Sequence, residues 1–353
     1  MRSVHADRLG LTAMLVAAAW AGVLVGCAGP AVAPVITETA YRVDPKEPPP
    51  EVPPTWPLTG EVGGVTARAA LAVKVENTAP ARPQTGLEQA DVIWEEMIEG
   101  GDTRFIAVYN SIVPDSVGPV RSVRPMDGPI LGAVGGLLAF SGGQERFIAK
   151  ARDAGLQVVM DGAAGFFRST TREIPYNLYL RPAEIWAQAD ISHRALPKGE
   201  FLFAASDFAA TAVTSGTAVT RVTASFSGVS QPNWTWDEDS RLFLRSERSA
   251  ASYSASGVRL SAANVVVLAA PVQDAGGTDS AGSPIPDTKI VGMGQGLVAT
   301  GGKAIEVSWS KPSVSSPITL TTASGDTVRL AVGQTWVELI PAQGGAWEVA
   351  AAD

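Results

Sequence analysis

The chain has 353 residues, of which 46% are hydrophobic and 18% charged, and its formal net charge is −8 at pH 7. This length and composition are those of a globular protein with enough residues for two ordinary domains. Binding to a phosphate backbone needs a basic footprint, so the acidic balance excludes nucleic acid as an expected partner.

The first 27 residues have the parts of a secretory leader. Arg2 and Arg8 supply positive charge, and an apolar segment runs from residue 9 to residue 25. The alternative, an uncleaved membrane-spanning helix, is disfavoured because the segment is short and no basic cluster follows it. The leader ends in Leu-Val-Gly-Cys, which resembles the lipobox of bacterial lipoproteins. We therefore expect a lipoprotein signal peptide over residues 1–27 and lipidation at Cys27.

A lipid on Cys27 would hold the mature protein at the extracytoplasmic face of the cell membrane, which is then its first expected partner. Cys27 is the only cysteine, so no thiol remains for a disulfide or a metal site. Residues 28–55 are dense in proline and contain few residues that could build a core. We expect them to form a disordered, extended spacer.

The first folded domain is expected over residues 56–205. Residues 70–75 have the pattern of a strand. Two further apolar segments, 91–98 and 103–110, flank Glu-Gly-Gly-Asp, and the first of them could also be a helix. The glycines favour a β-hairpin because they supply the positive φ angles of a tight turn.

A βαβ unit is the clearest local pattern. A short apolar strand at 137–140 precedes a helix at 144–154 and a second strand at 156–160. Such a crossover makes its two strands parallel. A short helix is expected to begin at Pro182 and to end near residue 189.

Small and hydroxylated residues at 206–217 indicate a linker, after which the helical period disappears. Strand patterns follow at 234–236, 242–244, 264–269, 304–309, 318–321, 328–330 and 336–340. The Gly- and Pro-rich residues 271–287 are expected to form an exposed loop. The expected fold class is α+β: an N-terminal mixed α/β domain containing the βαβ unit, followed by a mostly antiparallel β domain over residues 218–345.

The familiar catalytic motifs are missing. The sequence has no phosphate-binding loop, no His-Glu-x-x-His and no Gly-x-Ser-x-Gly. His193 is the single histidine of the expected mature chain and is read as an exposed residue. Ser308 and Lys311 match Ser-x-x-Lys, but they lie on an expected strand and lack companion motifs. The sequence therefore names no catalytic residue, no metal site and no cofactor, and it favours a protein that is not an enzyme.

Charged and polar residues concentrate between residues 74 and 177. Six of them are the candidate ligand-binding residues: Arg82, Glu99, Arg104, Arg121, Arg124 and Asn177. Arginine binds carboxylates and phosphates through two parallel hydrogen bonds, so converging arginines would form a polar cleft in the first domain. The alternative is that the arginines pair with Glu95, Glu99 or Asp91 and hold the strands together.

Glycosidases use a pair of carboxylates, so a glycosidase activity is an alternative hypothesis. Glu95 and Glu96 are adjacent, so on a strand they would point to opposite faces and could not act as the pair. Glu95 with Glu99, or Glu76 with Glu99, remains geometrically open.

Several motifs, taken in order, resemble the YerB-like lipoproteins, a bacterial family defined by an N-terminal and a C-terminal domain of unknown function. They are Arg82-Pro83-Gln84-Thr85-Gly86, Glu99-Gly100-Gly101-Asp102-Thr103-Arg104, Gly118-Pro119-Val120-Arg121-Ser122-Val123-Arg124-Pro125, Asn177-Leu178-Tyr179 and Gly333-Gln334-Thr335-Trp336-Val337. The resemblance implies a secreted, lipid-anchored, two-domain protein without an established reaction or cofactor. The family often has histidine before Asn-Leu-Tyr, whereas this chain has Tyr176, so no general acid or base is implied there.

Three functions follow as hypotheses. The leading one is a noncatalytic, lipid-anchored envelope protein that binds a cell-wall fragment or an envelope protein. The second is a hydrolase or transferase acting on cell-wall glycan, with Glu99 or Glu95 as acid or base. The third is an envelope scaffold, which Trp234 and Trp236 would support if both lay on one exposed face.

Overall fold

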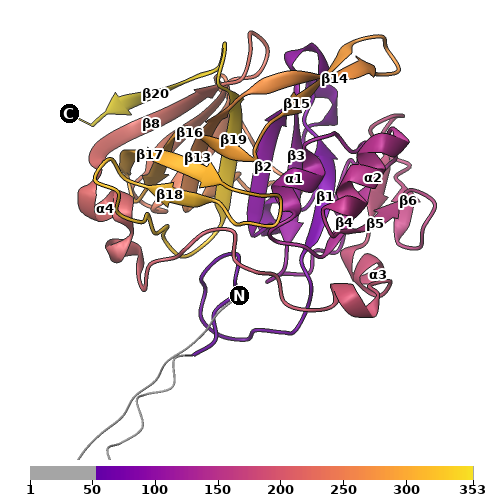
Figure 1. Ribbon diagram of the computed structural model, residues 1–353, viewed down its shortest axis with the longest axis horizontal. Helices are drawn as coiled ribbons and strands as arrows, with labels where there is room; N and C mark the ends of the chain where they lie inside the picture. The colour runs from indigo at the N-terminus through magenta and orange to yellow at the C-terminus, as the bar shows by residue number, and fades with distance from the viewer. Residues whose placement is uncertain (1–52, 353) are drawn as a thin grey trace, which may run out of the picture. The chain divides into compact units, whose positions relative to one another are not determined.

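A single 16-stranded sheet connects the two halves of the chain in the computed structural model, which describes residues 53–352 (Figure 1). The predicted signal peptide, Cys27 and residues 28–52 of the predicted spacer lie outside the described residues. The described residues belong to one compact unit, Val52–Asp353. Strands dominate and helices are few, which agrees with the α+β class.

The first half of the chain supplies five neighbouring strands of this sheet: β1 (Leu71–Glu76), β2 (Val92–Met97), β3 (Thr103–Tyr109), β4 (Leu137–Phe140) and β5 (Gln157–Met160). Their order in space is β2-β3-β1-β4-β5. Helix α2 (Glu145–Asp153) links β4 to β5, which pair in parallel. The predicted βαβ unit is therefore confirmed. The predicted hairpin is also present, because β2 and β3 pair antiparallel on either side of the turn η3 (Glu99–Gly101).

The second half supplies the remaining strands of the sheet, which pair mostly in antiparallel fashion. They are β8 (Thr217–Ser225), β9 (Pro232–Asp237), β10 (Leu242–Glu247), β11 (Ala250–Ala251), β12 (Ser261–Ala262), β13 (Asn264–Ala270), β16 (Gly292–Thr300), β17 (Lys303–Lys311), β18 (Thr319–Thr321), β19 (Thr335–Pro341) and β20 (Ala346–Ala351).

Strand β19 joins the two halves. It lies between β13 and β2 and pairs in parallel with both. The sheet is thus continuous across the predicted linker at 206–217, which here contains η5 (Asp207–Ala209) and α4 (Thr211–Ser215).

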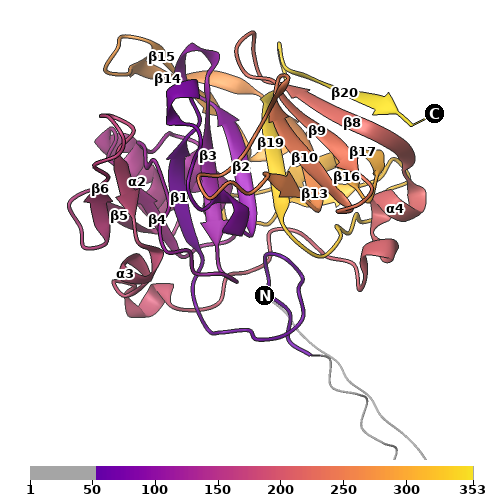
Figure 2. The same ribbon diagram turned by 180° about the vertical axis from the view of Figure 1, so that it is seen from behind.

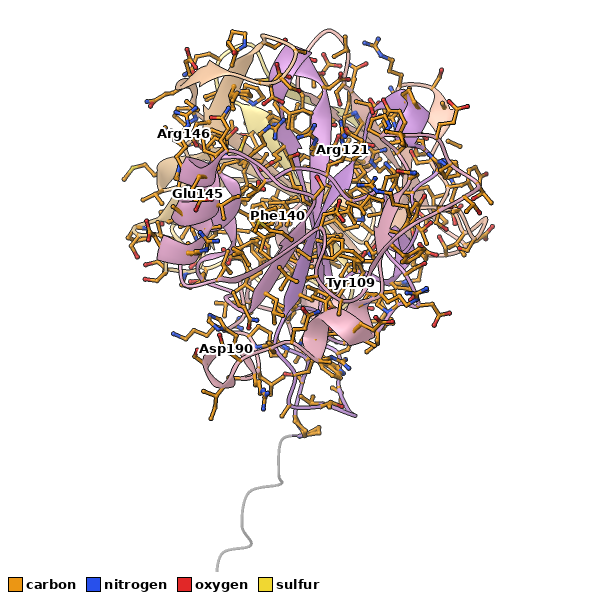
Figure 3. All side chains as sticks on the ribbon, turned by 90° about the vertical axis from the view of Figure 1, so that its right-hand side faces the viewer. Tyr109, Arg121, Phe140, Glu145, Arg146 and Asp190 are labelled. Carbon is orange, nitrogen blue, oxygen red and sulfur yellow. The ribbon has the colours of Figure 1, made fainter. Side chains whose placement is uncertain are left out.

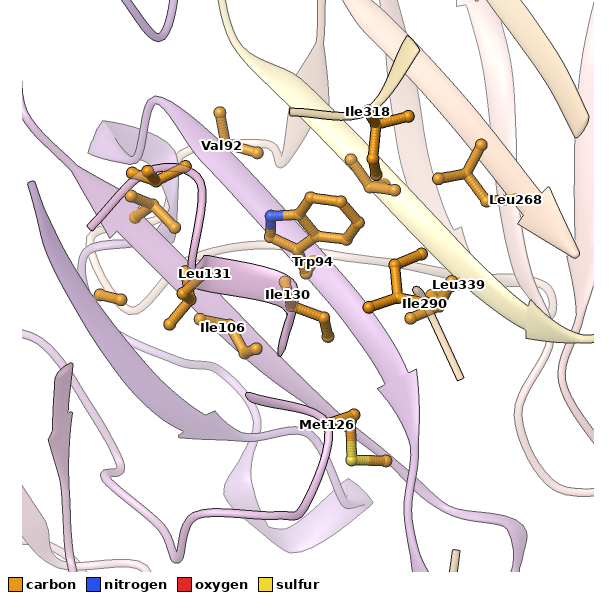
Figure 4. Packing of buried hydrophobic residues seen from close by; sticks show 14 of the residues in the cluster. Val92, Trp94, Ile106, Met126, Ile130, Leu131, Leu268, Ile290, Ile318 and Leu339 are labelled. Atoms are coloured by element: carbon orange, nitrogen blue, oxygen red, sulfur yellow. The ribbon is translucent and has the colours of Figure 1, made fainter. Parts of the chain in front are cut away.

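The first face of the central sheet is covered by α1 (Asp127–Leu131), α2 and the segment around β18 (Figure 1). Trp94 lies in this apolar layer, surrounded by α1 residues and by the second-half residues Ile318 and Leu339 (Figure 4). Its indole stacks on Phe201, with ring centroids 6.2 Å apart. The predicted helix face Phe147, Ile148 and Ala151 is buried in the same layer.

The second face is covered by β8, β9 and β10, which fold back over β13, β19 and β2 (Figure 2). Trp234 of β9 is fully buried there, and its ring meets the Trp336 ring edge-on at 5.1 Å. Trp236 is half-buried and packs on Phe243. The exposed tryptophan pair that would have supported a scaffold is therefore not formed.

Three sequence expectations differ from the structure. Residues 271–287 are not a loop: β14 (Val272–Thr278) and β15 (Pro284–Thr288) form an antiparallel hairpin interrupted by an irregular register. Residues 328–330 make only an isolated bridge between Leu330 and Phe203. The predicted helix starting at Pro182 is shorter than expected, since α3 ends at Trp186. A small hairpin of β6 (Phe166–Arg168) and β7 (Leu178–Leu180) precedes it.

Candidate functional site

Charged residues gather at one edge of the sheet. Six strands of the central sheet run in the same direction: β13, β19, β2, β1, β4 and β5. Strand β3, which lies between β2 and β1, pairs antiparallel with both and runs in the opposite direction. Ligands of open parallel sheets bind outside the carboxyl ends of the strands. Arg121 lies toward this end of the molecule, and Asp190 lies at the opposite end (Figure 3).

Glu76, the last residue of β1, pairs with two arginines. Its Oε2 accepts from Nε of Arg104 at 3.2 Å and from Nε of Arg121 at 2.6 Å. Burial alone would raise the pKa of Glu76, but the charges of Arg104 and Arg121 and the hydrogen bonds from Arg121 and the Thr78 backbone lower it overall. Two cations share one carboxylate, and the Arg121 side chain is 27% exposed. We call these three residues the Glu76 cluster.

Arg124 and Glu99 form a two-pronged ion pair. Nε of Arg124 lies 2.6 Å from Oε1 of Glu99, and Nη2 lies 2.8 Å from Oε2. Only the Nη2–Oε2 contact is a hydrogen bond, because Nε of Arg124 and Oε1 of Glu99 have no hydrogen-bond partner among the described residues. The sequence analysis named Glu99 as a possible partner of the arginines, and Arg124 pairs with it. Arg104 and Arg121 pair instead with Glu76, which the sequence analysis did not name as a partner.

A buried triad lies on the same face of the sheet. Lys74 contacts Glu96, and its Nζ lies 2.9 Å from Oδ1 of Asp127. All three side chains are fully buried. Burial and the neighbouring Asp127 raise the pKa of Glu96 well above its usual range. The triad therefore favours a protonated Glu96.

Glu95 faces the opposite side of the sheet, as its position next to Glu96 predicts. Its oxygens accept from Thr103 Oγ1 at 2.6 Å, Asn77 Nδ2 at 3.0 Å and Arg245 Nη2 at 2.8 Å. Directly across β2–β19 lies Glu338, which accepts from Trp234 Nε1 at 2.8 Å. Burial and the Glu95 charge raise the pKa of Glu338 well above its usual range.

Arg245 is the central cation of this second face, and sequence reasoning missed it. Its guanidinium lies 5.4 Å from the ring centroids of both Phe105 and Trp336. Nη2 also lies 3.0 Å from Oε2 of Glu247. The sequence did contain a signal for it. Alternate residues of a strand share one face, so Arg245 and Glu247 lie on the same buried face of β10 as the apolar Phe243.

A cavity opens above Arg245 and Glu247. It measures about 320 Å³ and lies between the loop after η1 (Ala79–Ala81) and the segment from β11 to residue 260. Its lining is Arg82, Pro83, Gln84, Arg245, Glu247, Ala250, Ala251, Ser252, Tyr253 and Leu260. We call it the Arg82 cavity. Nε of Arg82 donates to Asn77 Oδ1 at 3.2 Å, and Nη2 lies 3.4 Å from Glu247.

The six candidate residues thus divide among four places. Arg104 and Arg121 meet at Glu76, Arg124 holds Glu99, and Arg82 lines the cavity. Asn177 precedes β7 and accepts from Nη1 of Arg168 at 3.0 Å. Its neighbour Tyr176 has its ring 6.0 Å from the Arg121 guanidinium. The arginines therefore share one edge of the sheet, but they do not line one common cavity.

The other sequence candidates lie apart from this edge. His193 contacts Asp190 at 2.8 Å and the carbonyl oxygen of Gly155 at 3.2 Å. Ser308 and Lys311 stand three residues apart on β17, so they point to opposite faces. Within residues 53–352 no group of three or more histidine, cysteine, aspartate or glutamate side chains could hold a metal ion. Among these same residues, none of the helices has the length and the apolar character of a membrane-spanning segment.

Comparison with known proteins places the chain among relatives of unknown activity. Residues 58–195 match the model described as "Protein of unknown function (DUF3048) N-terminal domain", and residues 222–337 match the corresponding C-terminal domain. A 70-residue segment is 50% identical to "Putative lipoprotein YerB" of Bacillus subtilis (strain 168). That segment is 19% of this chain and spans 21% of the relative's length.

A solved structure has the same fold. The crystal structure of YerB protein from Bacillus subtilis superposes with a TM-score of 0.70, and the match covers 83% of this chain and 99% of that chain. Sequence identity over the match is 22%, so this comparison supports the fold alone.

Proposed function

Because the chain belongs to the DUF3048 family, whose two domains are described as of unknown function, we propose its function from the site itself. The protein is a lipid-anchored binding protein of the cell envelope, tethered through Cys27 on the extracytoplasmic face, and its ligand occupies the Arg82 cavity. The observation that carries this proposal is a cavity with the ion-paired side chains of Arg245 and Glu247 at its floor and the half-buried Arg82 at its wall.

The cavity has the features of a binding pocket. Ligand pockets are concave and mostly apolar, with a few polar groups that fix orientation. Here apolar walls surround Arg82, Gln84 and Ser252. The pocket is built from both halves of the chain: the backbone N–H of Ala255 donates to the carbonyl oxygen of Gln84 at 2.8 Å, and Arg172 holds the carbonyl oxygen of Pro83 at 3.2 Å. These contacts keep the walls in place before any ligand arrives.

The carboxylates do not favour hydrolysis. A general acid or base must come within hydrogen-bond reach of its substrate. Glu95 is fully buried and accepts from three protein donors, and Glu99 is ion-paired with Arg124. Neither lines the Arg82 cavity. A glycan hydrolase or transferase using Glu95 or Glu99 is therefore the weaker candidate.

Of the six predicted residues we retain Arg82 as a ligand-binding residue. The Glu76 cluster and the Arg124–Glu99 pair are proposed to shape the strand ends beside the cavity. Asn177 is proposed to order the β6–β7 hairpin through Arg168.

The test is calorimetric binding of a soluble peptidoglycan digest to the full-length protein, purified from membranes in detergent. Wild type should release or absorb binding heat, and Arg82→Ala should weaken binding at least tenfold. Arg152→Ala, which removes an exposed arginine on α2, is the control and should bind like wild type. New reducing ends in the digest, formed by wild type but not by Glu95→Gln, would instead establish a hydrolase.

A further inference from the structure

The charges of the Arg82 cavity balance within the protein. Arg245 is paired with Glu95 and Glu247, and Arg82 approaches Glu247 at 3.4 Å. Behind Glu95, the raised pKa of Glu338 favours its neutral, protonated form. A charged ligand would find no unpaired counter-charge here, because each charged side chain that lines the cavity already has an oppositely charged partner. The cavity therefore disfavours anions and cations.

Hydrogen-bonding capacity nevertheless remains at the cavity wall. Among residues 53–352, Nη1 of Arg82 has no hydrogen-bond partner. The amide nitrogen of Gln84 donates to Asn77 Oδ1 at 3.0 Å and to the carbonyl oxygen of Glu76 at 3.1 Å, which leaves its side-chain oxygen to accept. Ser252 Oγ accepts from Arg245 at 3.0 Å and keeps its hydroxyl hydrogen. The wall therefore offers both hydrogen-bond donors and an acceptor. A sugar hydroxyl can accept from the donors and donate to the acceptor.

An aromatic ring stands at the mouth of the cavity. Tyr253 is 49% exposed, which is high for a large aromatic side chain in a folded protein. The Arg259 guanidinium lies 5.4 Å from its ring centroid and holds the ring from one side. Pro83 and Leu260 continue the apolar wall. A pyranose has an apolar C–H face and a polar edge, so it can pack on such a ring while its hydroxyls reach the polar groups.

We infer that the Arg82 cavity binds a neutral saccharide, with a pyranose ring packed on Tyr253 and its hydroxyls bonded to Arg82, Gln84 and Ser252. This assignment rests on the proposed binding function and specifies its ligand class. In an envelope protein the matching source is the glycan of the cell wall.

The experiment compares two defined probes on the full-length protein by calorimetry: an uncharged β-1,4-linked N-acetylglucosamine tetramer and a polyglycerol phosphate. We expect the tetramer to bind and the polyanion not to bind. Tyr253→Ala should weaken tetramer binding at least tenfold, and Tyr253→Phe should stay within twofold because the ring remains. Tyr176→Ala, a tyrosine outside the cavity, is the matched control and should leave binding unchanged.

The outcomes separate the two proposals. If the polyanion binds, Arg82→Ala weakens that binding and the tetramer does not bind, the binding function stands and the saccharide assignment is overturned. If neither probe binds and Arg82→Ala leaves binding of the peptidoglycan digest unchanged, both fall. Thermal unfolding of each variant shows that it is folded, and Tyr253→Phe provides a conservative variant should Tyr253→Ala fail to fold.

Discussion

Glu95 and Glu338 face each other across the parallel strands β2 and β19, and both side chains are fully buried. One belongs to the first half of the chain and the other to the second, so the contact between the halves contains a pair of acids. Arg245 compensates one negative charge at 2.8 Å from Glu95. Two adjacent carboxylates cannot both ionise cheaply in a buried site, so a proton is retained there.

The first prediction concerns Glu338. Burial, followed by the charge of Glu95, raises its pKa, so the folded state holds the proton more tightly than the unfolded chain. The resulting stability is complete below the unfolded carboxyl pKa and is lost as pH rises through the folded pKa. Glu338→Gln cannot ionise and keeps an oxygen for Trp234. Urea unfolding from pH 5 to pH 9 should show wild type losing stability relative to Glu338→Gln, whereas parallel curves would contradict a retained proton.

The second prediction concerns Lys74. Its ammonium group is the cation of a fully buried triad with Glu96 and Asp127. Removing one partner of a buried ion pair costs about 3–5 kcal/mol because the other charge stays unpaired. We expect Lys74→Met to lower the free energy of unfolding by that amount at pH 7, measured by urea denaturation.

The control for Lys74 is the exposed ion pair of Arg152 and Glu145, whose atoms lie 2.8 Å apart. Surface pairs contribute about 0–1 kcal/mol, so Arg152→Met should change the unfolding free energy by no more than that. Equal losses in the two variants would mean that Lys74 is not the cation on which the buried carboxylates depend.

The third prediction concerns Cys27, which lies outside the described residues. If it carries the lipid, Cys27→Ser should lose incorporation of a labelled fatty acid and should leave the membrane fraction. Mass spectrometry of the wild-type mature N-terminus should find an acylated cysteine. Retention of the label in Cys27→Ser would contradict anchoring at this residue.

Local pattern sufficed for part of the fold. The sequence bounds of β4 agree with the structure, and α2 differs by one residue at each end. Both elements are specified by neighbours: an apolar run of four residues, and a helical face with Gly155 just beyond the end. Gly155 has φ +84°, the left-handed backbone that ends a helix. The opposite orientation of Glu95 and Glu96 also follows from strand geometry alone.

Strand β16 shows where local pattern fails. Its first half carries glycines at 292, 294 and 296, a composition that disfavours a strand. The structure requires glycine at 294 because an added Cβ would lie 2.6 Å from both the Trp309 indole nitrogen and the carbonyl oxygen of Ala269. Close packing against β17 and β13, and not the local strand propensity, requires glycine at position 294.

The candidate site depended on partners far away in the sequence. The sequence named Glu99 as a possible partner of the arginines, and Arg124 pairs with it. It did not identify Arg245, because Arg245 and Glu95 are 150 residues apart and meet only when β10 folds over the central sheet. The same holds for Arg82, in the loop after η1, and Glu247, at the end of β10, which come from different halves of the chain. The residue types alone predict that arginines and carboxylates pair. Which arginine pairs with which carboxylate depends on the topology of the fold.

The last prediction concerns Glu200, a nearly fully buried acid between the two halves. Its Oε1 accepts from the backbone N–H of Ile318 at 3.0 Å and lies 3.7 Å from Nζ of Lys311. Burial outweighs both contacts and raises its pKa from 4.5 to about 7. The folded state then loses stability as pH rises from about 4.5 to about 7, by about 3 kcal/mol in total. Glu200→Gln should remove this slope in denaturant unfolding, whereas Glu184→Gln at an exposed pair should retain it; an unchanged slope in Glu200→Gln would mean that other acids set the pH dependence.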